Sequence, residues 1–201
     1  MTGHLVECTF YFVSHPNVQV RPDVPVPEWP LSELGHARMQ ACLRLPWVAS
    51  IGAIFSSPER KATDSATHLA AHLSLPFVEM PELGENDRSS TGYLPPQEFE
   101  VVADAFFSRP HESVRGWERA VDAQARVVSA VAKISEATRG LAAVAIVSHG
   151  AVGTLLYCHL ARQPISRRYD QPPNGGGNYF SFSMSPSTAR NWWLPIDEGG
   201  I

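Results

Sequence analysis

Short apolar runs alternate along the chain with longer segments in which apolar residues recur every three or four positions. Residues 8–13 (CTFYFV), 50–57 (SIGAIFSS) and 141–148 (LAAVAIVS) have the compact apolar pattern of buried strands. Residues 74–80 (SLPFVEM) are a weaker strand candidate, and the alternating residues 178–184 (NYFSFSM) predict a last strand. Because helical segments separate these strands, the pattern predicts a three-layer α/β/α sandwich with a mostly parallel central sheet.

Polar caps and apolar stripes predict the helices between these strands. Ser32 can cap a helix over residues 33–45, and Ser57 with Pro58 provides the residue types favoured at the start of the next helix. The helical period also predicts helices over residues 97–107, 117–138 and 152–160. We expect the 201 residues to form one domain, in which residues 81–113 are an irregular insertion covering a site.

Composition and charge narrow the class of protein. The formal net charge of −4 provides no broad basic field for a nucleic acid, and no apolar stretch approaches the ~18 residues of a membrane-spanning helix. Cys8, Cys42 and Cys158 are far apart and odd in number, which favours free thiols in a reducing cytoplasm. His68 and His72 lie four residues apart without an evident third ligand, so we expect neither a metal nor another cofactor. A homodimer is compatible with the sequence.

Candidate chemistry is concentrated directly after three predicted strands. His15 follows TFYFVS, Arg60 follows GAIFSSPE, and His149 follows VAIVS. The carboxyl ends of parallel strands form the ligand crevice of an open α/β sheet. One histidine in such a place is usually structural, but two imidazoles and a guanidinium together predict a site for an anionic group.

Five segments in this order resemble motifs of the histidine-phosphatase superfamily, which includes phosphoglycerate mutases. They are FVSHPN, WPLSELGHARMQA, IFSSPERKATDSA, PELGEND and AIVSHGAVGTLL, and the third resembles the family's SSPxxRxxxTA segment. The resemblance implies a phosphoglycerate mutase-like fold, His15 as a nucleophile that becomes phosphohistidine, and Glu85 as the acid. It also implies that Arg60 and His149 bind phosphate.

These roles agree with the chemistry of phosphoryl transfer. Neutral His15 can attack phosphorus, the planar fork of Arg60 suits phosphate oxygens, and protonated His149 adds donors and charge. Glu85 can protonate the leaving oxygen if its surroundings raise its pKa. Glu82 is a competing carboxylate in the same turn.

The first motif departs from the family, because Ser14 stands where the family has arginine before the nucleophile. Arg88, three residues beyond Glu85, is our first candidate for the missing cation, and Arg21 and Lys61 are weaker candidates. Asn17 can donate to phosphate or form a turn. The GGGN segment at 175–178 resembles a phosphate-cradling loop, although a turn before the last strand is the simpler interpretation.

The sequence therefore predicts a phosphomonoester hydrolase or phosphoryl-transfer enzyme acting on a small phosphorylated metabolite. The alternative is a weakly active or inactive domain of the same fold that binds a phosphorylated ligand or a protein. A serine–histidine hydrolase is disfavoured, because Ser148 lacks the flanking glycines of a nucleophile elbow.

Overall fold

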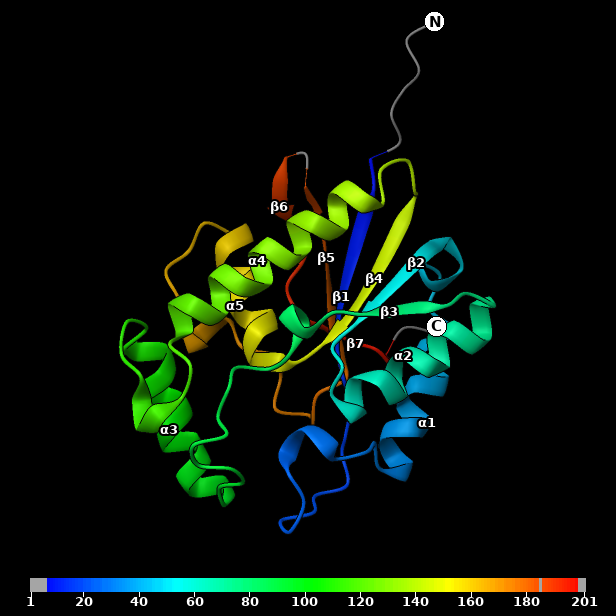
Figure 1. Cartoon of the computed structure of the whole chain (residues 1–201). Helices are drawn as coiled ribbons and strands as arrows, with labels where there is room; N and C mark the ends of the chain where they lie inside the picture. The colour runs from blue at the N-terminus through cyan, green and yellow to red at the C-terminus, as the bar shows by residue number, and fades with distance from the viewer. Residues whose placement is uncertain (1–6, 185, 199–201) are drawn as a thin grey trace, which may run out of the picture.

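A computed structural model describes residues 7–184 and 186–198 (Figure 1). The strands are β1 (Thr9–Ser14), β2 (Ile51–Ser56), β3 (Phe77–Glu79), β4 (Ala143–Ser148), β5 (Asn178–Met184), β6 (Ser187–Ala189) and β7 (Leu194–Pro195). The helices are α1 (Glu33–Cys42), α2 (Arg60–Leu73), α3 (Pro96–Ser108), α4 (Ala120–Ala137) and α5 (Gly150–Leu160). No helix within these ranges is long and apolar enough to cross a membrane.

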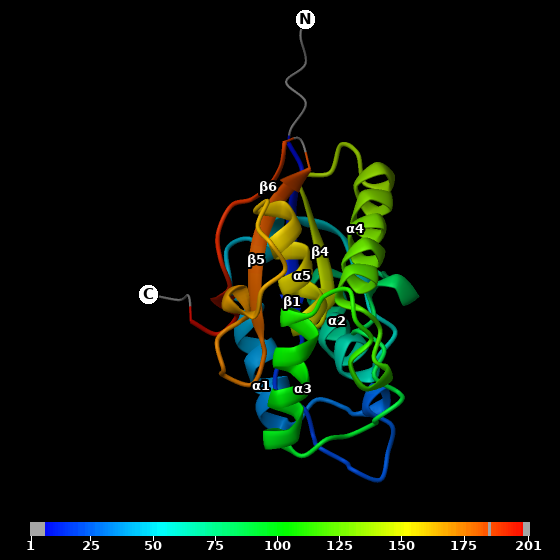
Figure 2. The same ribbon diagram turned by 90° about the vertical axis from the view of Figure 1, so that its left-hand side faces the viewer.

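One mixed sheet in the order β3-β2-β4-β1-β5-β6 forms the middle layer, with β7 paired to β5. The four strands β3, β2, β4 and β1 are parallel, and β5 runs antiparallel to β1. Helices α1 and α2 lie on one face, and α4 and α5 lie on the other (Figures 1 and 2). The predicted three-layer α/β/α fold with a mostly parallel sheet is therefore confirmed.

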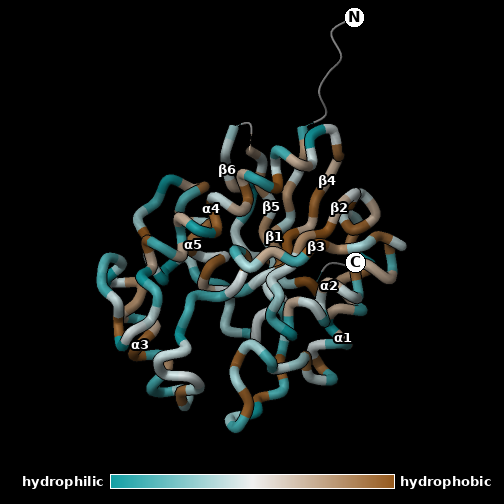
Figure 3. Tube along the Cα trace, viewed as in Figure 1, coloured by the Kyte–Doolittle hydropathy of each residue, from teal (hydrophilic) through white to brown (hydrophobic). Residues whose placement is uncertain are grey.

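A separate apolar core lies on each face of the sheet. Phe10, Phe12 and Ile146 point toward α4 and α5, whereas Ile54 and Val147 point toward α1 and α2. Every residue of β4 is buried, as expected for a central strand that is covered on both faces. Figure 3 shows apolar residues gathered along β4 and β2 in the middle of the molecule.

Several element boundaries differ from the sequence-based prediction. Helix α2 begins at Arg60 with Glu59 at its N-cap, so the expected start at Ser57 and Pro58 is wrong. The physical reason is that the backbone is still extended at Glu59 (φ −67°, ψ 138°). Ser57 Oγ accepts the N–H of Glu59 at 3.2 Å and also lies within hydrogen-bonding distance of His149. Helix α4 begins at Ala120 rather than near residue 117, and β3 is only three residues long.

Candidate active site

The register of the parallel strands brings the two histidines together. Ser14 at the end of β1 is the register partner of Ser148 at the end of β4, so His15 and His149 leave the sheet side by side. The backbone N–H of His15 donates to the carbonyl of Ser148 at 3.0 Å, and the two imidazole rings lie 5.2 Å apart, edge to face. The strand ends thus bring two of the three predicted residues together.

The hydrogen bonding of His15 determines which of its nitrogen atoms is free. Nδ1 lies 2.9 Å from the carbonyl oxygen of Pro16, and because a carbonyl only accepts, Nδ1 carries the proton. The lone pair of the neutral ring is therefore on Nε2. Burial, together with the nearby charge of Lys61, lowers the pKa of His15 to about 4, so the ring is neutral at pH 7.

His149 is fully buried, and its two nitrogen atoms have different surroundings. Nε2 lies 2.7 Å from Oγ of Ser57 and 3.3 Å from Oε1 of Glu59. Nδ1 is buried and has no hydrogen-bond partner within the described residues. Burial holds the pKa of His149 well below its usual range, although the Glu59 carboxylate opposes this.

Arg60 does not join this pair, and its neighbour Lys61 does. The Arg60 side chain is 62% exposed and binds Asp64 at 2.8 Å, whereas the Lys61 side chain is 3% exposed and binds Glu59 at 2.5 Å. Successive residues on a helix point about 100° apart, so a shift of one position turns a side chain from the site to solvent. The expectation for Arg60 is thus corrected. In the SSPxxR motif the arginine is the third residue after the proline, which is position 61 in this sequence. The motif therefore indicated Lys61, and we assigned the role to Arg60 instead.

Glu59 is a site residue that the sequence analysis missed altogether. Its Oε1 atom accepts the backbone N–H of Glu85 at 2.8 Å, and its Oε2 atom accepts from Lys61. Burial raises the pKa of Glu59, but the neighbouring His149, the charge of Lys61 and the hydrogen bonds from Lys61 and Glu85 lower it to about 2. Glu59 is thus held as a carboxylate between a buried ammonium and a buried imidazole.

Glu85, not Glu82, is the carboxyl group that lies at the start of the helix following His149. Its oxygens accept from the backbone N–H groups of Val152 at 3.1 Å and Ala151 at 3.4 Å, in the first turn of α5. Burial raises the pKa of Glu85, although the charge of Arg88 opposes this. Glu82 instead binds Lys133 at the surface, 3.1 Å away. Of the two candidate acids, Glu85 therefore has the surroundings that favour a transferable proton.

Arg88 approaches the same site from the loop before α3. Its guanidinium carbon lies 5.1 Å from the ring centre of Phe99 and 5.9 Å from that of Trp117. In the described part of the chain, no hydrogen bond or ion pair engages its side chain. Its charge contributes to lowering the pKa values of both His15 and His149. Arg88 also lines the same cavity as Glu59 and Glu85.

The remaining candidates support the backbone around His15. The buried Oγ of Ser14 donates to Gln171 at 2.6 Å and accepts from the backbone of Asn178 at 3.1 Å, so a guanidinium at position 14 would have to displace Gln171. Oδ1 of Asn17 accepts from Arg38 at 2.9 Å. The GGGN segment forms a turn in which the N–H of Gly177 donates to the His15 carbonyl at 2.9 Å.

Gly176 explains why that turn needs glycine. Its φ of +80° favours glycine, and a Cβ atom there would lie 2.3 Å from the His15 carbonyl oxygen. The segment holds the backbone of His15 in place through this close approach.

A cavity of about 540 Å³ adjoins His149 through Glu59 and is also lined by Val26, Pro27, Glu85 and Arg88 among others. Residues 85–92 from the expected covering insertion form one wall, and residues 25–27 from the proline-rich loop form another. The volume suits a small organic group attached to a phosphoryl group.

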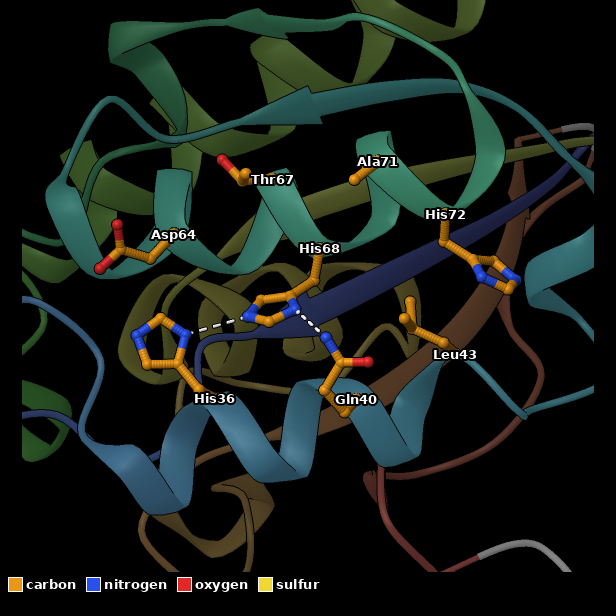
Figure 4. A pocket seen from close by; sticks show the side chains of 8 residues that line it. All are labelled: His36, Gln40, Leu43, Asp64, Thr67, His68, Ala71 and His72. Carbon is orange, nitrogen blue, oxygen red and sulfur yellow. Dashed lines mark hydrogen bonds between the residues drawn. The ribbon is translucent and has the colours of Figure 1, made fainter.

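A second cavity of about 550 Å³ lies between α1 and α2 and contains the histidines considered for a metal. His68 lies 2.9 Å from His36 and 2.9 Å from Gln40, one through each ring nitrogen. His72 points away from His68 (Figure 4). Within the described ranges, no group of three or more His, Cys, Asp or Glu side chains is arranged to hold a metal ion.

Comparisons with known proteins agree with the fold. The chain is similar in structure to a mycobacterial glucosyl-3-phosphoglycerate phosphatase bound to inorganic phosphate (TM-score 0.76, 19% identity, covering 94% of this chain and 99% of that one). It is also similar to Bacillus stearothermophilus YhfR (TM-score 0.75, 24% identity, 96% and 98%) and to a putative alpha-ribazole-5'-P phosphatase from Escherichia coli (0.73, 19%, 97% and 99%). No curated protein matches the sequence significantly.

The family model of the histidine phosphatase superfamily, branch 1, matches residues 12–189. These residues extend from within β1 to the end of β6 and include both histidines. Because the match spans most of the chain and contains the whole candidate site, the chain belongs to branch 1 of the histidine phosphatase superfamily.

Proposed function

We propose that this protein is a phosphomonoester hydrolase or phosphoryl-transfer enzyme that acts through a phosphohistidine at His15 on a small phosphorylated metabolite. One observation carries the proposal: the neutral His15 ring has its lone pair on Nε2 and lies against His149, whose neighbour Glu59 lines a cavity together with Glu85 and Arg88. The proposed chemistry requires neither metal nor cofactor.

The reaction divides into two steps at these groups. In the first, Nε2 of His15 attacks phosphorus, the ester P–O bond breaks, and Glu85 gives its proton to the leaving oxygen. In the second, water attacks phosphorus and gives a proton to Glu85, now a carboxylate, while the P–N bond to His15 breaks and phosphate leaves. The same carboxyl group thus serves as acid and then as base, which its raised pKa supports.

His149, Lys61 and Arg88 are the proposed phosphate-binding groups. Lys61 replaces Arg60 in this role because it is buried beside the histidines. Arg88 supplies the cation that position 14 lacks, since Ser14 is occupied with Gln171 and Asn178. Together they provide charge for an anion whose negative charge is spread over several oxygens.

A phosphate-binding domain with little catalysis remains the second candidate. Ser14 and the pairing of Lys61 with Glu59 favour it, because both reduce the positive charge available to a transition state. Turnover of a panel of phosphate esters, with and without chelator, separates the two functions. We expect chelator-insensitive hydrolysis, and binding of phosphate without hydrolysis of any ester would favour the second candidate.

The panel begins with esters of small sugars and nucleosides. Structural relatives of this chain are named as phosphatases of glucosyl-3-phosphoglycerate and of alpha-ribazole 5'-phosphate. At 19% identity they share the fold, and their substrates serve only as a starting point.

Lys61→Met and Arg60→Met are expected to differ sharply although the residues are neighbours. Lys61→Met leaves the buried carboxylate of Glu59 unpaired and should lower the free energy of unfolding by about 3–5 kcal/mol. Arg60→Met breaks an exposed helix pair worth about 0.3–0.5 kcal/mol. Urea denaturation and phosphate affinity measure both effects. Similar losses for the two variants would contradict the assignment of Lys61 to the site.

Arg88→Ala is expected to lower kcat/KM and phosphate affinity by about 10- to 100-fold, because one charge-assisted hydrogen bond is worth about 1.5–3 kcal/mol. Arg109→Ala serves as the control, because Arg109 directly follows α3 and binds Glu112 at the surface. If both variants keep wild-type phosphate affinity, the relocation of the missing cation to Arg88 is wrong.

A further inference from the structure

The charge next to His149 is unusual for a site that binds an anion. Glu59 lies within the group, 3.3 Å from Nε2 of His149 and 2.5 Å from Nζ of Lys61. A carboxylate here opposes phosphate binding through its charge and partly neutralises the buried ammonium group. Its position therefore calls for an explanation other than attraction of the ligand.

The two nitrogen atoms of His149 provide that explanation. The nearer partner of Nε2, the Ser57 hydroxyl at 2.7 Å, can donate or accept, whereas the Glu59 carboxylate only accepts. Glu59 therefore favours a proton on Nε2, which leaves the lone pair of the neutral ring on Nδ1. Nδ1 is buried and unpartnered within the described residues, and its ring lies edge to face against that of His15. Nδ1 can donate to a phosphate oxygen beside His15 only if the ring takes up a second proton.

We infer that Glu59 is the counter-ion that lets His149 take up a proton when a phosphoryl group enters, so that anion binding by this protein is coupled to proton uptake. The inference rests on the proposed phosphate site and deepens it. Glu59 acts as a positioning residue: it fixes the tautomer of the empty site and stabilises the imidazolium of the occupied one.

The other titratable groups around His149 act in the opposite direction. Burial most strongly, and then His15, Lys61 and Arg88, disfavour a positive charge on the ring, whereas the Glu59 carboxylate favours it. Burial and the three basic groups outweigh Glu59 in the empty site, so His149 is neutral there and an entering dianion is needed to protonate it. Affinity is then full at low pH and falls as pH rises toward the raised pKa of His149 in the complex.

Sulfate is the appropriate probe, because it keeps two charges across the neutral range and any proton taken up must go to the protein. We expect the association constant of wild-type protein to fall about tenfold per pH unit, which corresponds to one proton. Ring nitrogen NMR of histidine-labelled protein should show both nitrogen atoms of His149 protonated in the sulfate complex.

In Glu59→Gln, no carboxylate faces Nε2, so the Ser57 hydroxyl can donate to it, and neutral His149 can carry its proton on Nδ1 and bind sulfate without proton uptake. We expect only one protonated nitrogen in that complex and an affinity that hardly depends on pH. The double variant Glu59→Gln/Lys61→Met removes both members of the buried ion pair. It therefore leaves no unpaired ammonium group in the interior, and titration of Lys61 cannot contribute to its pH dependence. Glu82→Gln, a surface carboxylate paired with Lys133, should behave as wild type.

The inference is overturned if His149 is neutral in the wild-type sulfate complex, or if it remains doubly protonated in the folded variants that lack Glu59. If either result is found while sulfate still binds and ester turnover is normal, the inference about Glu59 fails but the proposed function stands. Proton uptake as expected in a protein that turns over no ester would instead refute the proposed hydrolase and keep the role of Glu59. Failure of sulfate to bind at all would overturn both.

Discussion

His15→Ala is expected to reduce ester turnover by about 10⁴-fold or more, since the variant lacks the atom that forms the covalent intermediate. The effect on the fold should be small, because within the described residues the side chain hydrogen-bonds only its neighbour Pro16 and belongs to neither apolar core. Rapid quenching with a labelled ester should trap an acid-labile, base-stable phosphoprotein in wild type and none in the variant.

His72→Ala provides the matched control, because His72 is an exposed histidine in the last turn of α2. It should keep both turnover and the trapped phosphoprotein. Undiminished turnover in His15→Ala would refute the phosphohistidine mechanism, whereas trapping in both proteins would move the nucleophile to another residue.

The strand ends were the part of the site that the sequence could predict. A central parallel strand is apolar along its whole length, so β4 stands out in the sequence, and the first polar residues after it must lie at the crevice. His15 and His149 are placed by this argument alone, and the strand register then makes them neighbours. Glu85 needed the family resemblance, because nothing in the local pattern of a loop separates it from Glu82.

The errors came from side-chain direction at the start of a helix. Arg60 and Lys61 are adjacent cations, and the sequence favoured the one with the better phosphate-binding chemistry. Helix α2 begins two residues later than expected. In this position Arg60 points to Asp64 at the surface, and Lys61 points into the protein interior. Glu59 could not be predicted either, because a carboxylate beside an anion site becomes reasonable only when its buried partners, Lys61 and His149, are seen.

Glu85→Gln is expected to slow hydrolysis of alkyl phosphates by about 10²–10⁴-fold and that of aryl phosphates far less. An alkoxide leaves poorly without a proton, which glutamine cannot supply, whereas an aryl oxide needs little protonation. Glutamine keeps the shape of the side chain, and its oxygen can still accept from Val152 in the first turn of α5. Kinetics on the two ester types, with Glu82→Gln as the control, measure the difference.

The pH dependence provides an independent test of the same role. Glu85 must be protonated to act first as an acid, so wild-type turnover of alkyl phosphates should fall as pH rises through its raised pKa. His15 must be neutral to attack, so turnover should also fall as pH drops toward about 4. Glu85→Gln should keep the acidic limb set by His15 and lose the part of the basic limb that Glu85 sets. Equal losses for both ester types, with an unchanged basic limb, would assign Glu85 a structural role at the first turn of α5 instead.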